Sequence, residues 1–366
     1  MDTRRARLIL NALPNIGPVT LRRLLDAHGT PEAVLSAPRA GLMSVRGVGP
    51  AIADTIHSWR NHFDPEREES RISAHGMRFL IPEDPEYPEL LKEIFDPPIG
   101  LYAAGPANAP ARCVGVVGTR RPTPYGKSLA REIGGALAQA GWCVVSGMAR
   151  GVDSEAHRGA LDAGGATMAV LGCGADIVYP PENLPLYREI VAKGAVLSEF
   201  PLGRPADKRT FPMRNRIVAG MCKAVVVIES DEDGGSLITA RFAADMGRCV
   251  CAFPGRVDQP TSRGCHALIR EGATLVTGAA DILEELGQAP RQRLLNLGLG
   301  DASAEDAATT PEEARLLALF TGGARHSSDS LAEQSGLPIS TVSTLLMELE
   351  LRGRLSRELD GTYEAC

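Results

Sequence analysis

Short apolar runs alternate with stretches of helical periodicity through the middle of the chain. Most runs are rich in Val, Ala, Ile and Leu and are bounded by Gly, Pro or charged residues, as strands buried on both faces are. Such alternation predicts an α/β fold with a Rossmann-like, doubly wound, mostly parallel sheet, which binds ligands at the carboxyl ends of its strands. The predicted strands are 113–117, 142–146, 167–171, 195–198, 224–229, 248–252 and 274–276.

The pattern changes before this central domain, whose bounds we place at 111–286. Residues 1–62 hold a weak repeat, Leu13 to Pro18 and Val45 to Pro50, each part followed by an amphipathic helical stretch. This repeat resembles the helix-hairpin-helix (SAM-like) motif, and it also fits a small helical bundle divided by Gly-Pro turns. Residues 63–110 are rich in Pro and acidic residues, and we interpret them as a structured connector with a short strand near 78–81.

The pattern changes again after the central domain. Residues 287–310 lack periodicity and predict a linker. Residues 311–366 show three helical patterns and a hairpin with an Asp-Gly turn, which is the outline of a winged helix. Its last helical pattern carries Glu348 and Glu350, which would lie near phosphate in a DNA groove. We therefore expect this domain to contact a protein partner.

Composition limits the partners of the whole chain. The formal net charge is -6 and the pI about 5.7, so global electrostatics would not attract nucleic acid or acidic membranes, and any anion site must be local. Eight cysteines are scattered without a CxxC pair, as reduced thiols are. No stretch approaches a membrane span, and no motif indicates a metal or a cofactor. We predict a cytoplasmic protein that has neither a metal nor a cofactor.

The first candidate loop follows the strand 113–117. Gly118 and Thr119 lead into Arg120 and Arg121, and a helix is predicted to begin at Pro124. A phosphate could meet bare N–H groups at that helix start and the fixed charge of the two arginines. The loop is neither GxGxxG nor GK[ST], so it does not predict NAD or ATP binding. An ordinary turn with solvated arginines fits the same residues.

A second loop, SGMARGVD, follows the next strand. Ser146 and Gly147 begin it and Arg150 adds a charge, while Asp153 could cap the next helix or orient Arg150.

Another loop, the fourth along the chain, follows the strand ending at 229 and passes through Gly-Gly into a helix whose start offers an anion site. Its predicted ligand residues are Gly235, Ser236 and Thr239. Acidic residues 231–233 suit this role only if they turn outward.

The third loop, KRTFPMRNR, carries the strongest local charge. Basic side chains flank an aromatic ring, as single-stranded nucleic acid requires: cations for phosphates and a ring face for a base. Because Pro follows Phe211, we expect a loop here. The competing interpretation is a solvated basic face with Phe211 turned inward. The candidate binding residues are Lys208, Phe211, Arg214, Asn215 and Arg216.

Together these motifs resemble the DNA processing protein A family over residues 80 to 285. The resemblance rests on GTR at 118–120, SGMARGVD, GCGADIVYPPEN, SEFP, FPMRNR, GGSLITA and FPGRVDQPTSRG in this order. It implies a protein that binds and protects incoming single-stranded DNA in natural transformation, promotes loading of the RecA recombinase, and forms a homodimer through the Rossmann-like domain. The end domains would serve further protein partners.

The resemblance also assigns residues. Gly118 and Arg120 match the family's phosphate-binding turn, and Gly235, Ser236 and Thr239 match its pocket wall. The basic and stacking segment corresponds to Lys208, Phe211, Arg214 and Asn215. Thr119 stands where the family often has serine, and Arg150 where lysine is frequent, which keeps the charge but not the geometry.

An enzyme of another class is the alternative. GGSLITA resembles the GG-x-GT-x-x-E loop of phosphoribohydrolases, which process nucleotides on a related fold. Ala240 and Arg241 stand where that family places its catalytic glutamate. His157, near Asp153, is interpreted as a satisfied histidine on a helix face. We therefore predict a protein that is not an enzyme.

Overall fold

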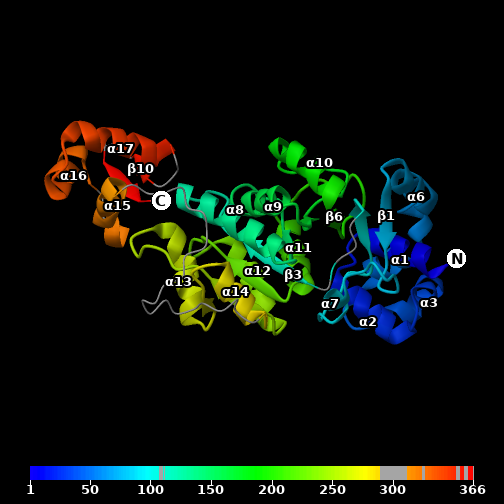
Figure 1. Cartoon of the computed structure of the whole chain (residues 1–366). Helices are drawn as coiled ribbons and strands as arrows, with labels where there is room; N and C mark the ends of the chain where they lie inside the picture. Colours follow the sequence, from blue (N-terminus) through cyan, green and yellow to red (C-terminus); the bar gives the residue numbers. More distant parts are fainter. Residues whose placement is uncertain are drawn as a thin grey trace. The chain divides into compact units, whose positions relative to one another are not determined.

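The computed structural model describes residues 1–106, 110, 112–288, 311–323, 326–351, 355–357 and 362–365. The chain divides into two compact units, Met1–Gln292 and Arg293–Cys366, each of which is described by itself (Figure 1). The first unit contains the helical N-terminal region and the central sheet. The second contains the C-terminal helices and hairpin.

A nine-stranded sheet forms the centre of the first unit within the described residues, in the order β1-β2-β6-β5-β4-β3-β7-β8-β9. Neighbours from β6 to β9 pair in parallel, whereas β1–β2 and β2–β6 are antiparallel. The predicted doubly wound, mostly parallel sheet is confirmed. The strands are β1 (Met77–Leu80), β2 (Leu101–Ala104), β3 (Cys113–Val117), β4 (Cys143–Ser146), β5 (Thr167–Leu171), β6 (Ala195–Ser198), β7 (Ala224–Val227), β8 (Cys249–Ala252) and β9 (Thr274–Leu275).

The strand order reverses between β3 and β7. From β3 the chain proceeds through β4 and β5 to β6, returns to β7 beside β3, and continues outward through β8 to β9. In open α/β sheets a crevice opens beyond the carboxyl ends of the strands at such a reversal, because the helices on either side run to opposite faces. The reversal therefore marks the expected place of a ligand site.

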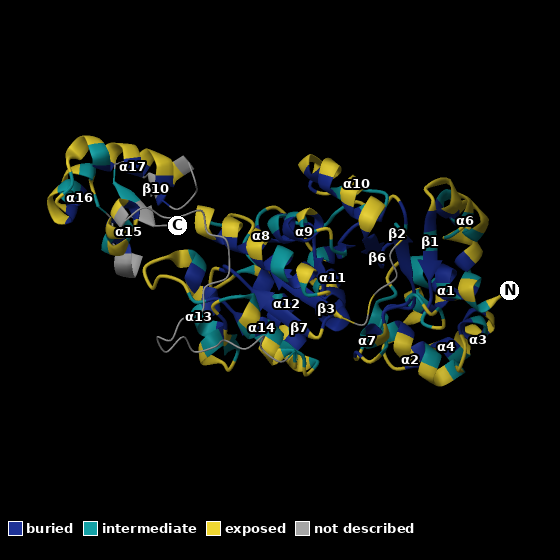
Figure 2. Ribbon diagram, viewed as in Figure 1, coloured by how far each residue is buried: buried dark blue, intermediate teal, exposed yellow. Residues whose placement is uncertain are grey.

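Helices cover both faces of the sheet (Figure 2). One core joins Val114, Val116 and Val226 to apolar side chains of α8, α9 and α14. The opposite core joins Val145 and Val225 to side chains of α11, α12 and α13. The bounds are α8 (Pro124–Gln139), α9 (Val152–Asp162), α10 (Leu184–Lys193), α11 (Thr210–Met221), α12 (Gly235–Asp245), α13 (Arg263–Arg270), α14 (Ala279–Glu285), η2 (Pro181–Asn183) and η3 (Pro260–Ser262).

The segment interpreted as a connector contributes to the sheet instead. Residues 63–110 form α6 (Pro65–Ala74), β1, α7 (Glu89–Lys92) and β2. β2 pairs with β6, Ala103 opposite Leu197, and all its residues are buried. The short run LYAA between proline-rich stretches gave little sign of a strand, because its pairing partner lies far along the chain. The boundaries placed at 62, 110 and 286 stay predictions.

The N-terminal repeat forms the predicted helical hairpins. Gly17 precedes Pro18 at the start of α2, and Gly49 precedes Pro50 at the start of α5, so each Gly-Pro step begins a helix. These helices enclose an apolar cluster of their own. Their bounds are α1 (Thr3–Ala12), α2 (Pro18–His28), α3 (Pro31–Ser36), α4 (Arg39–Met43), α5 (Pro50–His57) and η1 (Trp59–Asn61).

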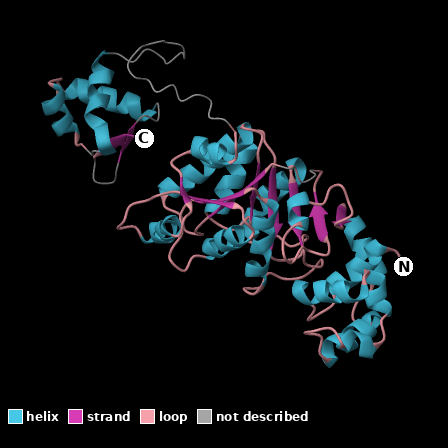
Figure 3. Cartoon of the chain, turned by 90° about the horizontal axis from the view of Figure 1, so that it is seen from below, coloured by secondary structure: helices cyan, strands magenta, loops and turns pink. Residues whose placement is uncertain are grey.

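The second unit is a winged helix, as predicted (Figure 3). It comprises α15 (Pro311–Leu317), η4 (Ala318–Gly323), α16 (Ser328–Ser335), α17 (Ile339–Leu351), β10 (Leu355–Arg357) and β11 (Tyr363–Ala365). The two strands pair antiparallel, Ser356 opposite Glu364. The predicted Asp-Gly turn and nearly all of the predicted linker 287–310 lie outside the described residues.

Candidate nucleic-acid interface

A cavity of about 830 Å³ opens at the carboxyl ends of the strands, where the strand order reverses. We call it the main pocket. Its walls come from the turns that follow β3, β4 and β7 and from the first turns of α11 and α12. Twelve of the predicted site residues line it: Gly118, Thr119, Arg120, Arg121, Gly147, Lys208, Phe211, Arg214, Asn215, Gly235, Ser236 and Thr239.

The start of α8 is not the open anion cradle that we predicted. The buried carboxylate of Glu229 accepts hydrogen bonds from the backbone N–H of Thr123 at 2.8 Å and from its hydroxyl at 2.6 Å. Thr123 Oγ1 in turn accepts from the N–H of Gly126 at 3.0 Å. The helix start is thus occupied by the protein's own carboxylate, and the first loop contributes Arg120 and Arg121 to the main pocket, both of them exposed.

A carboxylate also occupies the second loop. Asp153 neither caps α9 nor pairs with Arg150; its Oδ2 accepts from the N–H groups of Gly147 at 3.1 Å and Ala149 at 3.3 Å. Burial raises the pKa of Asp153, and Arg214 opposes that rise. Arg150 forms an exposed ion pair with Glu182, and the buried Ser146 hydroxyl donates to the Val116 carbonyl at 2.6 Å. Neither Ser146 nor Arg150 lines the main pocket.

The third segment is helical from Thr210, which corrects the predicted loop. Pro212 lies in the first turn of α11, where its missing N–H breaks no helical hydrogen bond. The half-buried Phe211 ring lies 5.2 Å from the Arg120 guanidinium carbon and 5.6 Å from the Tyr179 ring, measured to ring centroids. Lys208, exposed just before the helix, lines the same pocket.

Arg214 and Arg216 have opposite roles although they lie two positions apart. The nearly buried Arg214 lines the main pocket and donates to the Val170 carbonyl, while its Nε has no partner among the described residues. Burial lowers the pKa of Arg214, and Asp153 acts against that lowering. Residues two apart on a helix point to different sides.

Arg216 accordingly points away from the main pocket. It is buried in ion pairs with Glu199 at 2.5 Å and Asp96 at 3.1 Å. The prediction that places Arg216 in the binding site therefore has no support from its position. Asn215, between the two arginines, lines the pocket and donates to the carbonyl of Gly235 at 3.3 Å, which ties α11 to α12.

The start of α12 remains open. Gly234 is its N-cap, no side chain caps it, and its first turn has no acidic residue. A Cβ atom at Gly235 would meet nothing within 4 Å. The acidic residues 231–233 are exposed, although Asp231 also lines the main pocket. No side chain therefore caps this helix start, and its role as an anion site stays a prediction.

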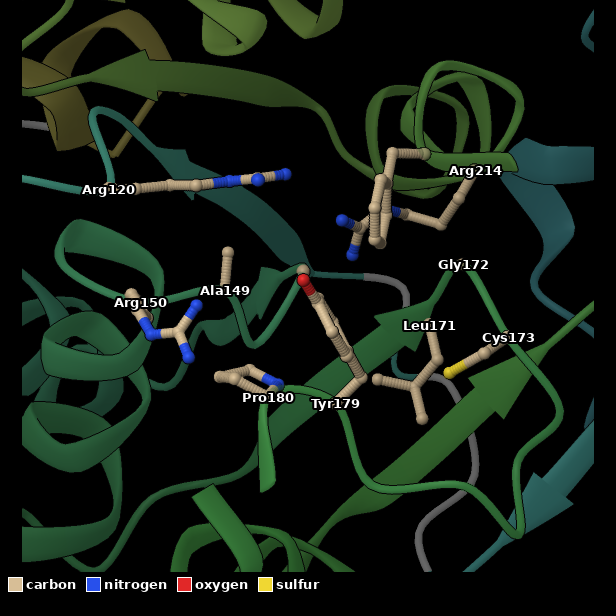
Figure 4. A pocket seen from close by; sticks show the side chains of 11 residues that line it. Arg120, Ala149, Arg150, Leu171, Gly172, Cys173, Tyr179, Pro180 and Arg214 are labelled. Atoms are coloured by element: carbon tan, nitrogen blue, oxygen red, sulfur yellow. The ribbon is translucent and has the colours of Figure 1, made fainter. Parts of the chain in front are cut away.

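Tyr179 is a pocket residue that sequence reasoning missed. It lines the main pocket and a smaller one beside it, which we call the Tyr179 pocket. Figure 4 shows its ring extending into the space that Arg120, Arg150 and Arg214 enter from other elements. The available signal was an aromatic residue before two prolines in a loop that follows a buried strand.

No group of three His, Cys, Asp or Glu side chains in the described part of the chain could hold a metal ion. The same part contains no helix long and apolar enough to cross a membrane.

His157 is fully buried in α9, where Nδ1 lies 2.6 Å from the Thr167 hydroxyl and burial lowers its pKa to about 3.

Fold and pocket define a class: a Rossmann-like α/β protein with a crevice lined by several cations at the strand reversal, a helix-hairpin-helix region and a winged helix. Residues 78–287 match the family model of DNA recombination-mediator protein A. Residues 7–58 match a SAM-like helix-hairpin-helix tandem, and 300–361 the DprA winged helix domain. The chain belongs to the DNA recombination-mediator protein A (DprA/Smf) family, as the sequence motifs predicted.

Individual relatives agree with this assignment. Protein Smf of Synechocystis is 34% identical, over 98% of this chain and 97% of its own. The crystal structure of DNA processing protein A from Streptococcus pneumoniae is 33% identical with a TM-score of 0.65, over 76% of this chain and 95% of its own. DNA processing protein A from Helicobacter pylori, solved to study its binding of single-stranded DNA, is 29% identical with a TM-score of 0.52, over 58% of this chain and 96% of its own.

Proposed function

We propose that this protein binds single-stranded DNA in the main pocket. The observation that carries the proposal is the gathering of unpaired cations, an open helix start and an aromatic ring around one cavity. The binding mode studied in the Helicobacter pylori relative supports the same ligand class. In transformation, such a protein would protect incoming strands and promote loading of RecA, without catalysis and without a cofactor.

Phosphates would bind to the cationic side of the pocket. Arg120, Arg121 and Lys208 are exposed, and no carboxylate among the described residues lies within ion-pair distance of them. Guanidinium groups match phosphate oxygens in a bidentate manner, and the N–H groups at the start of α12, which lines the same pocket, add further donors. Because this binding releases counterions, its affinity should fall steeply with salt.

A base would stack in the aromatic corner of the pocket. Phe211 packs against the backbone of Gly172, where an added Cβ would lie 2.8 Å from its ring, so one side of the ring is fixed by the protein. Tyr179, which is 37% exposed, supplies a second ring. Stacking on such rings contributes about 1–3 kcal/mol for each base and accepts any sequence.

Homodimers would form through the outer end of the sheet. β9 pairs only with β8 among the described strands, and its Leu275 is half exposed. An edge strand with an exposed apolar residue is suited to pairing with a second copy. The predicted RecA contact, the further partners of the end domains and a cytoplasmic location are part of this proposal and rest on membership of the family.

Fluorescence anisotropy of a labelled single-stranded oligonucleotide, with duplex in parallel, tests the proposal on the full chain. The Arg120→Ala, Lys208→Ala double variant should bind more weakly and with a smaller salt dependence. An Arg188→Ala, Lys193→Ala variant is the matched control, because both residues are exposed on α10 and line neither the main nor the Tyr179 pocket. Equal affinities in folded variants would refute the site. Release of a base from nucleoside monophosphates would favour the enzyme alternative.

A further inference from the structure

We propose a second strand-binding site on the far side of the Arg120–Arg121 turn, where phosphates of the same DNA strand bind after it leaves the main pocket. This inference rests on the proposed function. The site is a cavity of about 470 Å³, which we call the outer basic pocket. Its charged walls are Arg120, Arg121, Lys127, Arg150, Arg158 and Glu155.

Four segments bring these charges together, the first of which is the Arg120–Arg121 turn before α8. Lys127 lies in the first turns of α8, Arg158 and Glu155 lie on α9, and Arg150 lies in the turn before α9. Glu155 and Arg158 share a face because they are three positions apart on a helix. Lys127 and Arg158 line the outer basic pocket without lining the main pocket, so their charges can be changed without altering the main site.

The carboxylates near the outer basic pocket are already engaged. Glu155 pairs with Arg158 at 2.6 Å and with Arg131 at 3.7 Å, and Glu182 pairs with Arg150. Arg121 and Lys127 are exposed, and no described carboxylate lies within ion-pair distance of either. Cations crowded into one concave site repel each other, and a bound anion relieves that repulsion.

The lining indicates the class of anion. Arg120 and Arg121 line both pockets, so a strand that contacts them in the main pocket is already at the rim of the outer one. The described residues that line the outer basic pocket include no aromatic side chain, and Pro122 is its bulkiest apolar residue. A base has no stacking surface there, whereas phosphodiester oxygens find several donors. The outer basic pocket is therefore a site for the sugar-phosphate backbone.

Strand length and salt test this inference on the full chain. The Lys127→Gln, Arg158→Gln variant should bind the shortest oligothymidylates of a series of roughly 4 to 16 nucleotides as the wild type does, and the longer ones more weakly. For the longer strands the slope of log affinity against log salt should be shallower by about 0.7 for each phosphate that the variant no longer neutralises, so by about 0.7 for Lys127 alone and by about 1.4 where Arg158 exchanges Glu155 for a phosphate. Arg188→Gln, Lys193→Gln is the control with the same charge change.

The outcomes separate this inference from the proposed function. We call Lys127→Gln, Arg158→Gln the outer variant and Arg120→Ala, Lys208→Ala the main-pocket variant. If the main-pocket variant weakens binding and the outer variant changes neither affinity nor slope at any strand length, the outer site is refuted and the main site stands. Equal weakening of short and long strands by the outer variant also refutes it. If the main-pocket variant has no effect, the proposed function itself fails. A variant with Arg158→Lys keeps the charge and should therefore keep the wild-type slope. If the double variant unfolds, Lys127→Gln is tested alone, because it alters only an exposed side chain.

Discussion

The starts of α8 and α12 lie at the same edge of the sheet and differ in what occupies them. Both follow a buried strand through a glycine-containing turn. At α8 the carboxylate of Glu229 accepts the N–H of Thr123, 106 residues away in sequence, whereas at α12 no side chain caps the helix. Asp153 fills the turn between β4 and α9 in the same way.

A helix start can bind an external anion only when no carboxylate of the same chain already occupies it. A helix start attracts any anion, and a carboxylate of the same chain binds there without losing the translational freedom that a ligand loses. Such a carboxylate converts an anion site into a structural contact. In this protein carboxylates of the chain occupy the start of α8 and the turn before α9, whereas no side chain caps the start of α12.

The largest expected effect comes from removing the charge that fills α8. Glu229→Gln should lower the free energy of unfolding by about 3 kcal/mol, because two charge-assisted hydrogen bonds to Thr123 are weakened in a buried place. Urea unfolding measures the change. Glu232→Gln, an exposed carboxylate just before α12, is the control and should change little. Equal stabilities of the two variants would contradict the distinction between filled and open helix starts.

Acid should destabilise the protein through His157. Its pKa is lowered by burial to about 3 from 6.5 in the unfolded chain, so the unfolded state binds the extra proton between these values. The contribution of His157 to the free energy of unfolding should therefore be fully present above pH 6.5. Below this pH the free energy of unfolding should fall by at most about 1.4 kcal/mol per pH unit, which amounts to roughly 2 kcal/mol by about pH 5. Asp153, whose pKa is raised by burial, has the opposite sign and offsets part of this loss at lower pH.

Thermal unfolding across this pH range measures the His157 effect. The His157→Gln variant should show a flatter dependence, since its side chain does not titrate. Replacing the exposed His75 by Gln is the control and should leave the profile unchanged. A profile that stays as steep in His157→Gln would assign the acid sensitivity to other groups.

Two glycine substitutions test the same contrast by size. Gly126→Ala should lower the free energy of unfolding by about 1–3 kcal/mol, because its Cβ would collide with the Glu229 carboxylate. Gly235→Ala should raise it by about 0.4–1 kcal/mol, because a Cβ there meets nothing and the unfolded chain loses freedom. Urea unfolding of both variants gives the answer, and destabilisation by Gly235→Ala would show that the start of α12 is not open.

Placing a carboxylate at the open start of α12 should make it resemble the start of α8. Gly235→Asp places a carboxylate in the first turn of α12, where it should stabilise the helix by about 0.3–1 kcal/mol and weaken DNA binding by roughly tenfold through repulsion of phosphate. Anisotropy and thermal unfolding on the same sample measure both effects. Gly235→Asn is the control with nearly the same size and no charge, and equal affinities of the two variants would remove α12 from the phosphate site.

Much of the fold could be predicted because it depends on local pattern. The seven strands from β3 to β9 appear where short apolar runs predicted them, within a few residues, and the Gly-Pro steps begin helices. β2 was missed, because the four residues of LYAA become a strand only by pairing with β6. The loop expected around Phe211 is helical, since proline is tolerated in the first turn.

The sequence predicted that the candidate residues gather at one edge of the sheet, but it did not predict which of them line the main pocket. Carboxyl ends of parallel strands meet at one edge, so residues after successive strands had to gather there. Whether each side chain enters the main pocket depends on its direction and partners. Arg214 enters and Arg216 does not, because Asp96 and Glu199 hold the latter in buried ion pairs.

The sequence by itself determined the order of the parallel strands β3 to β9, the three kinds of domain, the family, and the edge of the sheet at which the cations and the ring collect. These properties follow from periodicity and from motif residues close together in the chain. Only the tertiary structure decided which helix starts are open, that Tyr179 lies beside Phe211, and that a second basic cavity adjoins the first. Those properties depend on contacts such as Glu229 with Thr123, between residues that only folding brings together.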